Sequence, residues 1–568
     1  MTMDDGGDRL DERAWPERAW IMAGLLGAMG LAFGLLVDRG ERGYADPLPI
    51  WRQLTAAFLF VTGIATVLVT QPRRWRWAAI FAVATGLVVA RVGWSTVQYN
   101  TVRPSLFEWS FLSALFAALL AAPLFQTVRD EGRWRFPYRT LHLHAWTDAV
   151  IGAAGLAFVG LSFLVTALLG ALLHLIGIDF IQDALREGWF GWLLAGTAFG
   201  AASGILRESD RLLATLLKVV LVVLSILAPV FAAGITLFLV ALPFTGLQPL
   251  WETDSATPIL LICAAGGVVF VNAVIGNGRD ERTGSRILHG AAMVLAVTIL
   301  PLAMIAAVSM GQRIGQYGWT PERLWAAVTV LVGIAYGAAY LASVAIARRK
   351  FDDRLRPLNT RLAIATCGLA ILLATPFVDF GGIATRSQVA RLDAGKVTPE
   401  EFDFWALKED FGPTGRRALQ ALRTSKDARV AAAAKASDQA DNRYQAGNAA
   451  RARSRIDPVR RNLTMADGSL PSDALVKATA QEYGLCTKFP CIAVALGGTR
   501  YAVVGNRFER GSIERMIVDS AQPEIERGIA REVEDEKTTL APGTRVEVRG
   551  VERRQVFVDG KPVGEPFE

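Results

Sequence analysis

The chain has 568 residues, 52% of them apolar and only 20% charged, whereas soluble chains usually carry about a quarter charged residues. Its net charge of +7 comes largely from arginines in short loops between apolar segments, a pattern that orients helices in a lipid bilayer and does not indicate a nucleic-acid partner. Long apolar blocks fill residues 19–378 and then stop, which excludes a soluble enzyme, a disordered chain and a fibrous protein. We therefore expect an all-α polytopic bundle of membrane helices followed by a smaller soluble α+β module.

Eleven apolar segments are long enough to cross a bilayer, which requires about 20 mainly apolar residues. They cover residues 19–37, 54–70, 77–97, 106–125, 149–176, 189–206, 218–243, 258–275, 287–310, 322–346 and 360–378. Residues 1–18 are rich in acids, and no small-residue cleavage site follows the first apolar run. We expect 1–18 to be a cytoplasmic N-terminal tail, the first span to be a retained anchor, and residues 19–378 to form the helix bundle.

The loops of the bundle differ in their content of basic residues. Loops after even-numbered spans hold 18 arginines and lysines, whereas loops after odd-numbered spans hold 7. Because basic residues concentrate in cytoplasmic loops, this asymmetry predicts a cytoplasmic N-terminus. Eleven spans then place the C-terminal region on the opposite side of the membrane.

Few strongly polar side chains fall within the predicted spans. Arg91 lies close enough to the outer end of its span to reach the interface, so we expect it to have a structural role. His174 and Asn272 lie near span ends, and we expect them to form hydrogen bonds between helices rather than to bind a ligand. The spans lack the mid-membrane carboxylates that proton-coupled pumps use, which counts against an ion-driven transporter.

The segment His142-Leu-His144-Ala-Trp-Thr-Asp148 leads from the predicted cytoplasmic side into the fifth span. His144 and Asp148 are four residues apart and therefore share one face of a helix. Zinc binding or a proton relay is one interpretation of these side chains. The chain has only 4 histidines and no conventional metal-ligand spacing. We therefore favour the start of a helix at the membrane interface, and we expect no cofactor.

Two loops on the predicted outer face carry aromatic residues beside acids. The first loop includes Trp251, Glu252 and Asp254, and the second includes Tyr317, Trp319 and Glu322. One interpretation is loop packing with aromatic anchoring at the membrane surface. The alternative is an interaction surface for a ligand or for the chain's own tail, with Phe402 and Trp405 as docking residues.

The region after the last span divides into two parts. Residues 379–470 predict short helices and a linker, with a capping box at Thr398-Pro-Glu-Glu401 and a solvated alanine-rich helix over 426–453. Residues 471–568 predict a small α+β module. Its expected elements are a helix from Ser472, a hairpin around Gly497-Gly498, a strand at 546–548 and a hairpin with the turn Asp559-Gly560.

Cys486 and Cys491 form a C-x₄-C pair in the last part of the chain. Zinc would need further ligands, and no histidine follows His289. A Cys-x-x-Cys redox motif is absent, as are the common motifs of nucleophilic and phosphate-transferring enzymes. Because thiols outside the cytoplasm are normally oxidised, we expect a short structural disulfide.

Several of these stretches resemble an uncharacterised family of bacterial polytopic membrane proteins, labelled domain of unknown function 4153. The resembling residues are His144-Ala-Trp146 with Asp148, Leu175–Phe180, Gly246–Glu252, Gln316–Leu324, Ser387-Gln388, Gly395–Val397 and Glu401–Asp403. The resemblance spans roughly residues 140–425. It implies a bacterial inner membrane and a periplasmic C-terminal tail, and it brings no known activity, catalytic residue or cofactor.

These patterns favour a non-enzymatic envelope protein that senses or scaffolds through its periplasmic face, with another envelope protein as a partner. The alternative is a transporter or channel for a small solute or lipid, which the span number and the intramembrane prolines Pro229 and Pro301 favour. A membrane enzyme acting on lipid or glycan is a second alternative, because the signatures of membrane enzymes are often dispersed. We lean toward a protein without enzymatic activity.

Overall fold

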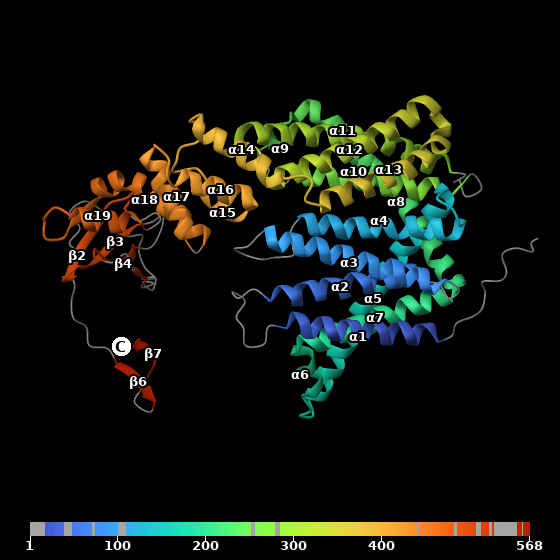
Figure 1. The fold of residues 1–568 in the computed structure, drawn as a ribbon, viewed down its shortest axis with the longest axis horizontal. Coiled ribbons are helices and arrows are strands. Elements are labelled where there is room, and N and C mark those ends of the chain that lie inside the picture. Colours follow the sequence, from blue (N-terminus) through green and yellow to red (C-terminus); the bar gives the residue numbers. More distant parts are fainter. Residues whose placement is uncertain are drawn as a thin grey trace, which may run out of the picture. The chain divides into compact units, whose positions relative to one another are not determined.

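The computed structural model describes residues 17–38, 48–70, 74–99, 109–251, 256–278, 285–440, 442–481, 486–506, 513–521, 525–527, 554–558 and 561–567. The chain divides into two compact units, Met1–Ala384 and Thr385–Glu568, which we call unit 1 and unit 2 and describe separately (Figure 1). Unit 1 is a bundle of long helices, and unit 2 combines short helices with strands. The predicted fold class, a membrane helix bundle followed by a smaller region with strands, is confirmed.

Long helices run side by side through unit 1 (Figure 1). They are α1 (Arg18–Val37), α2 (Ile50–Val69), α3 (Trp75–Tyr99), α4 (Trp109–Glu131), α5 (Tyr138–His174), α7 (Gly188–Glu208), α8 (Asp210–Thr245), α10 (Ala256–Ile275), α11 (Arg286–Tyr317), α12 (Pro321–Ala347) and α13 (Phe351–Ala374). Three short elements connect them: α6 (Phe180–Arg186), α9 (Gln248–Trp251) and the 3₁₀ turn η2 (Arg348–Lys350).

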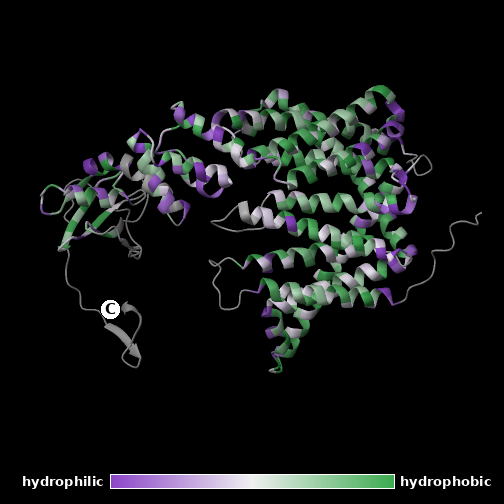
Figure 2. Ribbon diagram, in the orientation of Figure 1, coloured by the Kyte–Doolittle hydropathy of each residue, from purple (hydrophilic) through white to green (hydrophobic). Residues whose placement is uncertain are grey.

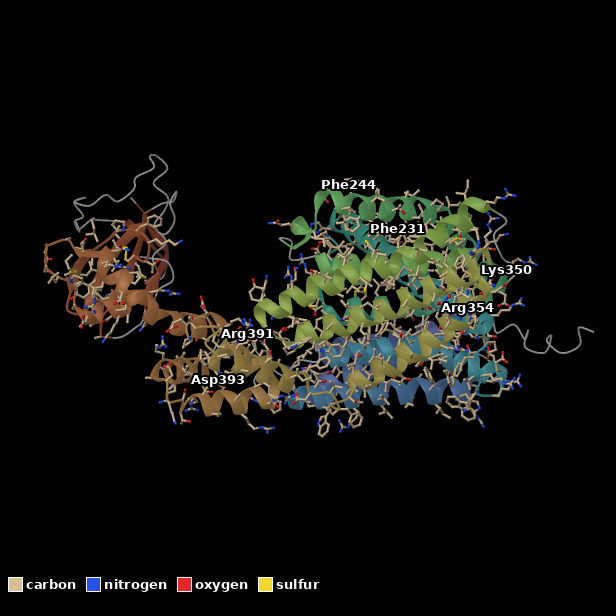
Figure 3. The ribbon with its side chains drawn as sticks, turned by 90° about the horizontal axis from the view of Figure 1, so that it is seen from above. Phe231, Phe244, Lys350, Arg354, Arg391 and Asp393 are labelled. Atoms are coloured by element: carbon tan, nitrogen blue, oxygen red, sulfur yellow. A yellow bond between two sulfur atoms is a disulfide. The ribbon has the colours of Figure 1, made fainter. Side chains whose placement is uncertain are left out.

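One end of unit 1 gathers the hydrophilic residues, whereas hydrophobic residues cover the helices along most of their length (Figure 2). We call it the arginine-rich end. It contains the starts of α1, α3, α5, α8, α11 and α13 and the ends of α2, α4, α7, α10 and α12. Figure 3 shows Lys350 and Arg354 at this end of the unit.

Ten helical segments among the described residues are long and apolar enough to cross a membrane, so the chain is a multi-pass membrane protein. The last segment, Pro321–Ala374, has 54 residues and contains α12, η2 and α13. The chain reverses at η2, because Tyr340 before it and Asn359 after it both bond to Asn272. The two predicted spans 322–346 and 360–378 are therefore the two arms of one helical hairpin.

Several helices begin before the apolar segments that predicted them, α5 and α13 by the most residues. α5 begins at Tyr138 rather than at residue 149, and α13 begins at Phe351 rather than at residue 360. The early turns of these helices carry Asp148 and Asp352, which are only 8% and 1% exposed. A hydropathy pattern limits a predicted span to its uncharged residues. A helix can extend beyond that limit when its charged side chains form hydrogen bonds inside the bundle. α5 therefore contains the helix start that was expected around 142–148, ahead of its span, whereas no polar start was predicted for α13.

α1 and α7 pack with their backbones in contact, through glycines spaced along both helices. A Cβ atom added to Gly196 or Gly200 of α7 would lie 2.2 or 2.3 Å from the carbonyl oxygen of Leu26 or Met22 in α1. A Cβ atom added to Gly30 of α1 would lie 2.2 Å from a carbonyl oxygen of α7. Small residues at such spacing let membrane helices approach closely and gain van der Waals energy. The glycines therefore allow α1 and α7 to pack closely against each other.

The helices of unit 1 form two groups. The first group contains α1 to α5 and α7, the second contains α8 and α10 to α12, and α13 packs against both. The second group surrounds a continuous apolar core that includes Leu295, Ile299 and Leu302. α4 and α13 join the groups, and the Ser113 hydroxyl of α4 donates a hydrogen bond to the Ala370 carbonyl oxygen of α13 at 3.0 Å.

Unit 2 contains short helices and a mixed sheet. Its helices are α14 (Phe380–Asp393), which begins in unit 1, α15 (Phe404–Glu409), α16 (Gly412–Leu422), α17 (Ala428–Gln439), α18 (Arg443–Asn462) and α19 (Asp473–Ala480). Its sheet has the order β1 (Leu463–Met465), β2 (Cys491–Gly497), β3 (Arg500–Asn506), β4 (Ile513–Asp519) and β5 (Ile525–Arg527). β1 runs parallel to β2, and the other neighbours are antiparallel. β6 (Arg554–Val558) and β7 (Lys561–Phe567) form a separate hairpin.

The predicted hairpin around Gly497-Gly498 joins β2 to β3, and both glycines have positive φ angles of 108° and 59°. The helix predicted from Ser472 is α19, with the Ser472 hydroxyl accepting a hydrogen bond from the Leu475 amide. The helix predicted over 426–453 is two helices, α17 and α18. The predicted strand at 546–548 and the turn Asp559-Gly560 lie outside the described residues.

The helix start predicted at Thr398 is wrong. The Thr398 hydroxyl donates a hydrogen bond to a Glu401 carboxylate oxygen at 3.1 Å rather than accepting from a backbone amide as in a capping box, and the segment forms only a turn. The helix begins later, at Phe404, where the Asp403 carboxylate accepts a hydrogen bond from the Ala406 amide at 3.0 Å. The N-cap Asp403, immediately before the apolar run, therefore determines the start of the helix.

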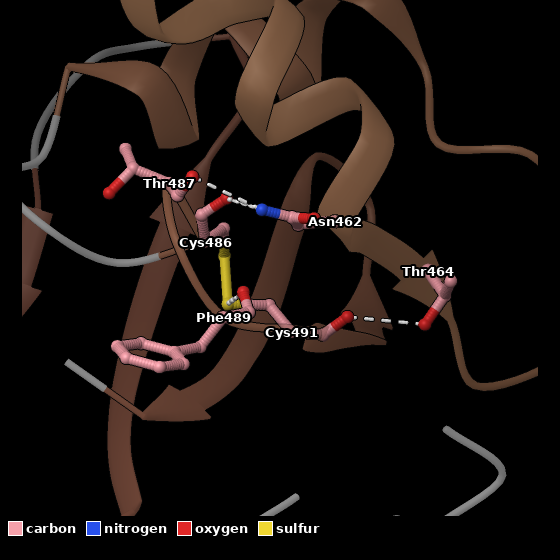
Figure 4. The surroundings of a disulfide bond; sticks show 6 residues. All are labelled: Asn462, Thr464, Cys486, Thr487, Phe489 and Cys491. Carbon is pink, nitrogen blue, oxygen red and sulfur yellow. Dashed lines mark hydrogen bonds between the residues drawn. A yellow bond between two sulfur atoms is a disulfide. The ribbon is translucent and has the colours of Figure 1, made fainter. Parts of the chain in front are cut away.

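A disulfide bond joins Cys486 to Cys491 in unit 2 (Figure 4). Both cysteines are fully buried in an apolar core with Val459 and Leu475. The Asn462 side-chain amide donates hydrogen bonds to the carbonyl oxygens of Cys486 and Thr487 at 3.1 and 3.2 Å. These bonds hold Cys486 in a left-handed conformation with φ of 60°, and they attach the disulfide loop to the end of α18.

Candidate functional site at the arginine-rich end

Three arginines donate hydrogen bonds to the last carbonyl oxygens of α2. Arg207 of α7 reaches the oxygen of Leu68, Arg129 of α4 reaches that of Val69 at 2.6 Å, and Arg18 of α1 reaches that of Thr70. The last carbonyls of a helix have no partner within the helix and carry a partial negative charge. The three guanidinium groups therefore satisfy these oxygens, and they tie four helices together.

Arginines also cap other helix ends in unit 1. Arg356 of α13 donates to the Ile275 carbonyl oxygen at 2.7 Å, at the end of α10. At the opposite end of the bundle, Arg52 donates to the carbonyl oxygens of Leu35 and Leu36 in α1, both at 2.7 Å. An arginine from a neighbouring helix thus caps α1, α2 and α10, and each cap is also a tie between helices.

Asp148 is the buried carboxylate of the site. One of its oxygens accepts a hydrogen bond from Arg207 at 2.9 Å, and the other accepts one from the Gln126 amide at 2.5 Å. Gln126 is fully buried, and the side chains of Arg207 and Asp148 are 10% and 9% exposed. A buried charge pair is stable only when both charges are matched and hydrogen-bonded, and here Arg207 also has the Leu68 oxygen as a partner. This arrangement locks α4, α5 and α7 to one another.

His144 lies one turn before Asp148 and contacts a different acid. Its Nε2 atom lies 2.9 Å from a carboxylate oxygen of Asp130, at the end of α4. The other oxygen of Asp130 accepts a hydrogen bond from Arg129 at 2.9 Å. His144 and Asp148 share a helix face, as their spacing predicts, but each meets its own partners rather than a common ligand.

Asn272 in α10 forms a partly buried junction between the two helix groups. Its side-chain amide donates to the Tyr340 hydroxyl of α12 at 2.7 Å and to the Val268 carbonyl oxygen at 2.8 Å. Its side-chain oxygen accepts from Asn359 of α13 at 2.7 Å and from the Tyr138 hydroxyl of α5 at 3.2 Å. An asparagine side chain has two donor hydrogens and two acceptor lone pairs, so its full capacity is used.

His142 extends this junction from α5. The Trp146 indole donates to His142 Nε2 at 3.0 Å, which makes Nε2 an acceptor and leaves the ring proton on Nδ1. Nδ1 then donates to the side-chain oxygen of Asn277, just after the end of α10. The first turns of α5 therefore face both groups, with His142 toward α10 and with His144 and Asp148 toward α4 and α7.

Arg91 and His174 lie outside this site. Arg91 is exposed, and its guanidinium lies 4.6 Å from the ring centroid of Trp94 one turn later in α3. His174 is exposed at the end of α5, where its Nδ1 atom pairs with Asp179. Both contacts are local, and neither brings a second helix of the bundle to the side chain.

The outer-loop residues form capping contacts where the structure describes them. Arg323 donates to the carbonyl oxygens of Tyr317 and Gly318 at 3.3 and 2.8 Å, and its guanidinium lies 5.3 Å from the Tyr317 ring centroid. Glu322 is exposed and Trp319 is half-buried. Of the first loop, Trp251 ends α9, whereas Glu252 and Asp254 lie outside the described residues.

The arginine-rich site is held by paired charges and by hydrogen bonds between helices. Within the described ranges, no three histidine, cysteine, aspartate or glutamate side chains come together as metal ligands would. The sequence identified Asn272, His142, His144 and Asp148. Their partners Arg207, Gln126, Tyr138, Tyr340 and Asn359 were missed, because these residues lie 22 to 134 positions away along the chain. The sequence gives one indication of these partners: polar residues occur at the same end of several apolar helices.

Residues 44–422 match the family described as a domain of unknown function, DUF4153. The match covers more than half of the chain. The chain belongs to this family. The DUF4153 match begins before α2 and ends with α16, so it includes the second to fourth spans, which the resemblance over 140–425 left out. The helix α1 and the sheet of unit 2 lie outside it. No curated protein and no solved structure matches the chain.

Proposed function

We propose that this DUF4153 protein is a bacterial inner-membrane protein that senses or scaffolds through a periplasmic unit 2, without enzymatic activity of its own. The observation that carries the proposal is the buried Cys486–Cys491 disulfide inside a folded unit attached to a membrane bundle. Disulfides persist in oxidising compartments and are rare in the cytoplasm. A unit 2 in the periplasm has the redox environment that this bond requires.

The distribution of basic residues supports the same orientation. The arginine-rich end carries the basic loops, and such loops stay in the cytoplasm. Within the described residues, unit 1 has eleven long helices, an odd number. α1 begins at the arginine-rich end, and α13 therefore ends at the opposite end. The chain enters unit 2 after α13, so a cytoplasmic arginine-rich end puts unit 2 in the periplasm.

Reporter fusions test this orientation. Alkaline phosphatase fused after Glu568 should be active in cells, because the enzyme needs a periplasmic location to form its own disulfides. The matched control is the same reporter inserted after Lys350, at the arginine-rich end, which should be inactive. Thiol labelling under denaturing conditions should modify Cys486 and Cys491 only after reduction. An inactive fusion after Glu568 together with thiols that label before reduction would overturn the proposal.

A truncation separates sensing or scaffolding from transport. Cells that produce only residues 1–384, which form unit 1, should behave like a gene deletion in an envelope-stress assay if unit 2 carries the function. Membrane insertion of the truncated chain, measured by its resistance to alkaline extraction, is the control. Full complementation by unit 1 alone would place the function in the bundle.

A transporter is the second candidate, and the Asn272 junction favours it. Transporters work by moving one group of helices against another, and this junction spans the boundary between the two groups of unit 1. Proteoliposomes with the intact chain would then release trapped small solutes or scramble labelled lipids, and Asn272→Ala would change the rate. Equal rates with and without protein would remove this candidate.

The docking of unit 2 on the outer loops stays a prediction. Phe402 and Trp405 are buried, and Trp405 packs with Ala440 and Ala446 inside unit 2. Trp319→Ala should still raise the protease sensitivity of residues 380–425 if the docking surface exists. Unchanged proteolysis would leave Trp319 as an anchor at the membrane interface.

A further inference from the structure

Two arginine–tryptophan segments are exposed at the arginine-rich end. The first is Arg74-Trp-Arg-Trp77 at the start of α3, and the second is Arg133-Trp-Arg135 in the turn between α4 and α5. The indoles are among the most exposed large side chains of the molecule: Trp134 is 84% exposed, Trp77 62% and Trp75 55%. We call residues 74–77 and 133–135 together the Arg–Trp rim.

The two segments of the rim lie next to each other. Arg74 donates a hydrogen bond to the carbonyl oxygen of Arg129, in the last turn of α4. Two turns into the helices, Phe81 of α3 stacks on Phe125 of α4 with ring centroids 4.3 Å apart. α3 and α4 are neighbours in the bundle (Figure 1), so the start of one and the end of the other present a single surface.

The described part of the chain does not balance the positive charge of the rim with acids. Asp130, the nearest acid in sequence, is engaged by Arg129 and His144, both at 2.9 Å. Glu131 accepts a hydrogen bond from the Thr140 hydroxyl at 3.3 Å. Among the residues that the structure describes, no acidic side chain forms an ion pair with Arg76, Arg133 or Arg135. Three exposed guanidinium groups therefore face outward beside three exposed indoles.

We propose that the Arg–Trp rim is a binding site for the phosphate groups of anionic phospholipids. Tryptophan is most favourable at the level of the lipid headgroups, which places the rim where those phosphates are. Arginine recognises phosphate through paired N–H donors, and a cluster of basic residues beside membrane helices attracts anionic headgroups. A soluble acidic peptide would match the charge, but it would leave the three indoles in water.

A lipid titration of the full chain tests the proposal. The purified protein in detergent is titrated with fluorescent phosphatidylglycerol, and unlabelled phosphatidylglycerol or phosphatidylcholine then competes. The rim variant is Arg76→Gln/Arg133→Gln/Arg135→Gln. The control is Arg211→Gln/Lys350→Gln/Arg354→Gln, which removes the same charge from exposed positions of the same end. We expect Kd for phosphatidylglycerol to rise about tenfold in the rim variant and less than about twofold in the control.

A single substitution tests the aromatic part of the rim. Trp134→Ala keeps every charge and should raise Kd for phosphatidylglycerol about threefold, because the indole sits beside the bound headgroup. Gel filtration and circular dichroism should be unchanged in both variants, since the altered side chains are exposed.

Four results would overturn the proposal. An equal loss of affinity in rim and control variants would mean attraction by charge alone, and equal competition by phosphatidylcholine would mean no preference for anionic lipid. Displacement of the labelled lipid by millimolar inorganic phosphate would assign the rim to a free phosphate. Displacement by an oligoglutamate peptide would assign it to an acidic protein.

Discussion

The α1–α7 pair and the Asp148–Asn272 region join helices of the same bundle in opposite ways. α1 and α7 meet through glycines, with backbone against backbone, and their contact depends on shape. At the arginine-rich end, helices meet through long polar side chains, and their contact depends on matched charges and hydrogen bonds. A shape contact should fail when volume is added, whereas a polar contact should fail when one partner is removed.

The largest loss of stability should come from breaking the buried Asp148–Arg207 pair. Asp148→Asn leaves the buried Arg207 without its counter-charge, so we expect a loss of about 4 kcal/mol in the free energy of unfolding, the usual cost of breaking one side of a buried pair. Denaturant titration in detergent, followed by tryptophan fluorescence, measures it. The control Asp183→Asn removes an exposed acid paired with Arg186 and should cost less than about 1 kcal/mol.

A double variant sharpens that result. Asp148→Leu/Arg207→Leu replaces both charges by apolar groups of similar size, and most of the lost stability should return. If the double variant is as unstable as Asp148→Asn, then the arginine contact with the end of α2 matters more than the charge pair does.

The next effect should come from the shape contact. Gly200→Leu in α7 would place its Cβ 2.3 Å from the Met22 carbonyl oxygen, so α1 must move away. We expect a loss of about 3 kcal/mol in the free energy of unfolding. Gly160→Leu is the matched control in α5, because its Cβ would meet nothing within 4 Å. Equal stability of the two variants would contradict the close approach of α1 and α7.

The Asn272 junction should show a smaller effect that is spread over several bonds. Hydrogen bonds between membrane helices contribute about 0.6 kcal/mol each on average, so Asn272→Ala should cost about 2 kcal/mol. Tyr340→Phe removes one of these bonds and should cost about 0.6 kcal/mol. In a double-mutant cycle the two losses should not add, because both variants lack the same bond. Additive losses would mean that Tyr340 and Asn272 act independently.

The smallest effect should come from Arg91. Its one described contact is with the Trp94 ring at 4.6 Å, and an exposed cation–π contact contributes about 0.5 kcal/mol. Arg91→Gln should therefore barely change the unfolding midpoint, and Arg91→Lys should change it less. A loss as large as that of Asn272→Ala would show that Arg91 has a partner at membrane depth.

The sequence predicted well those features that a single segment determines. The apolar run 54–70 is the helix Ile50–Val69, and 189–206 is Gly188–Glu208, because the length of an apolar run is enough to define a span. The alternation around Gly497-Gly498 likewise predicted β2 and β3. A helix start was expected around 142–148, where α5 begins, but the start of α13 was missed, because its polar first turns are stabilised by contacts with neighbouring helices.

The parts of the candidate site that were missed depend on pairs of distant segments. Asn272 was identified as a helix-packing residue, but nothing in its own span identifies Tyr138 or Asn359 as its partners. The glycines at 196, 200 and 204 stand at four-residue spacing in the sequence, and this spacing indicates close packing. It does not indicate that α1 is the partner helix.

The pairing of α1 with α7 sets an order for biogenesis. Gly27 lies against Thr197, and the chain between them must be synthesised and inserted before the two helices can meet. At about 5–20 residues per second, α1 waits in the bilayer for roughly 10 to 30 seconds with its glycine face open to lipid. α1 therefore packs against α7 only after the helices between them in the chain have been made.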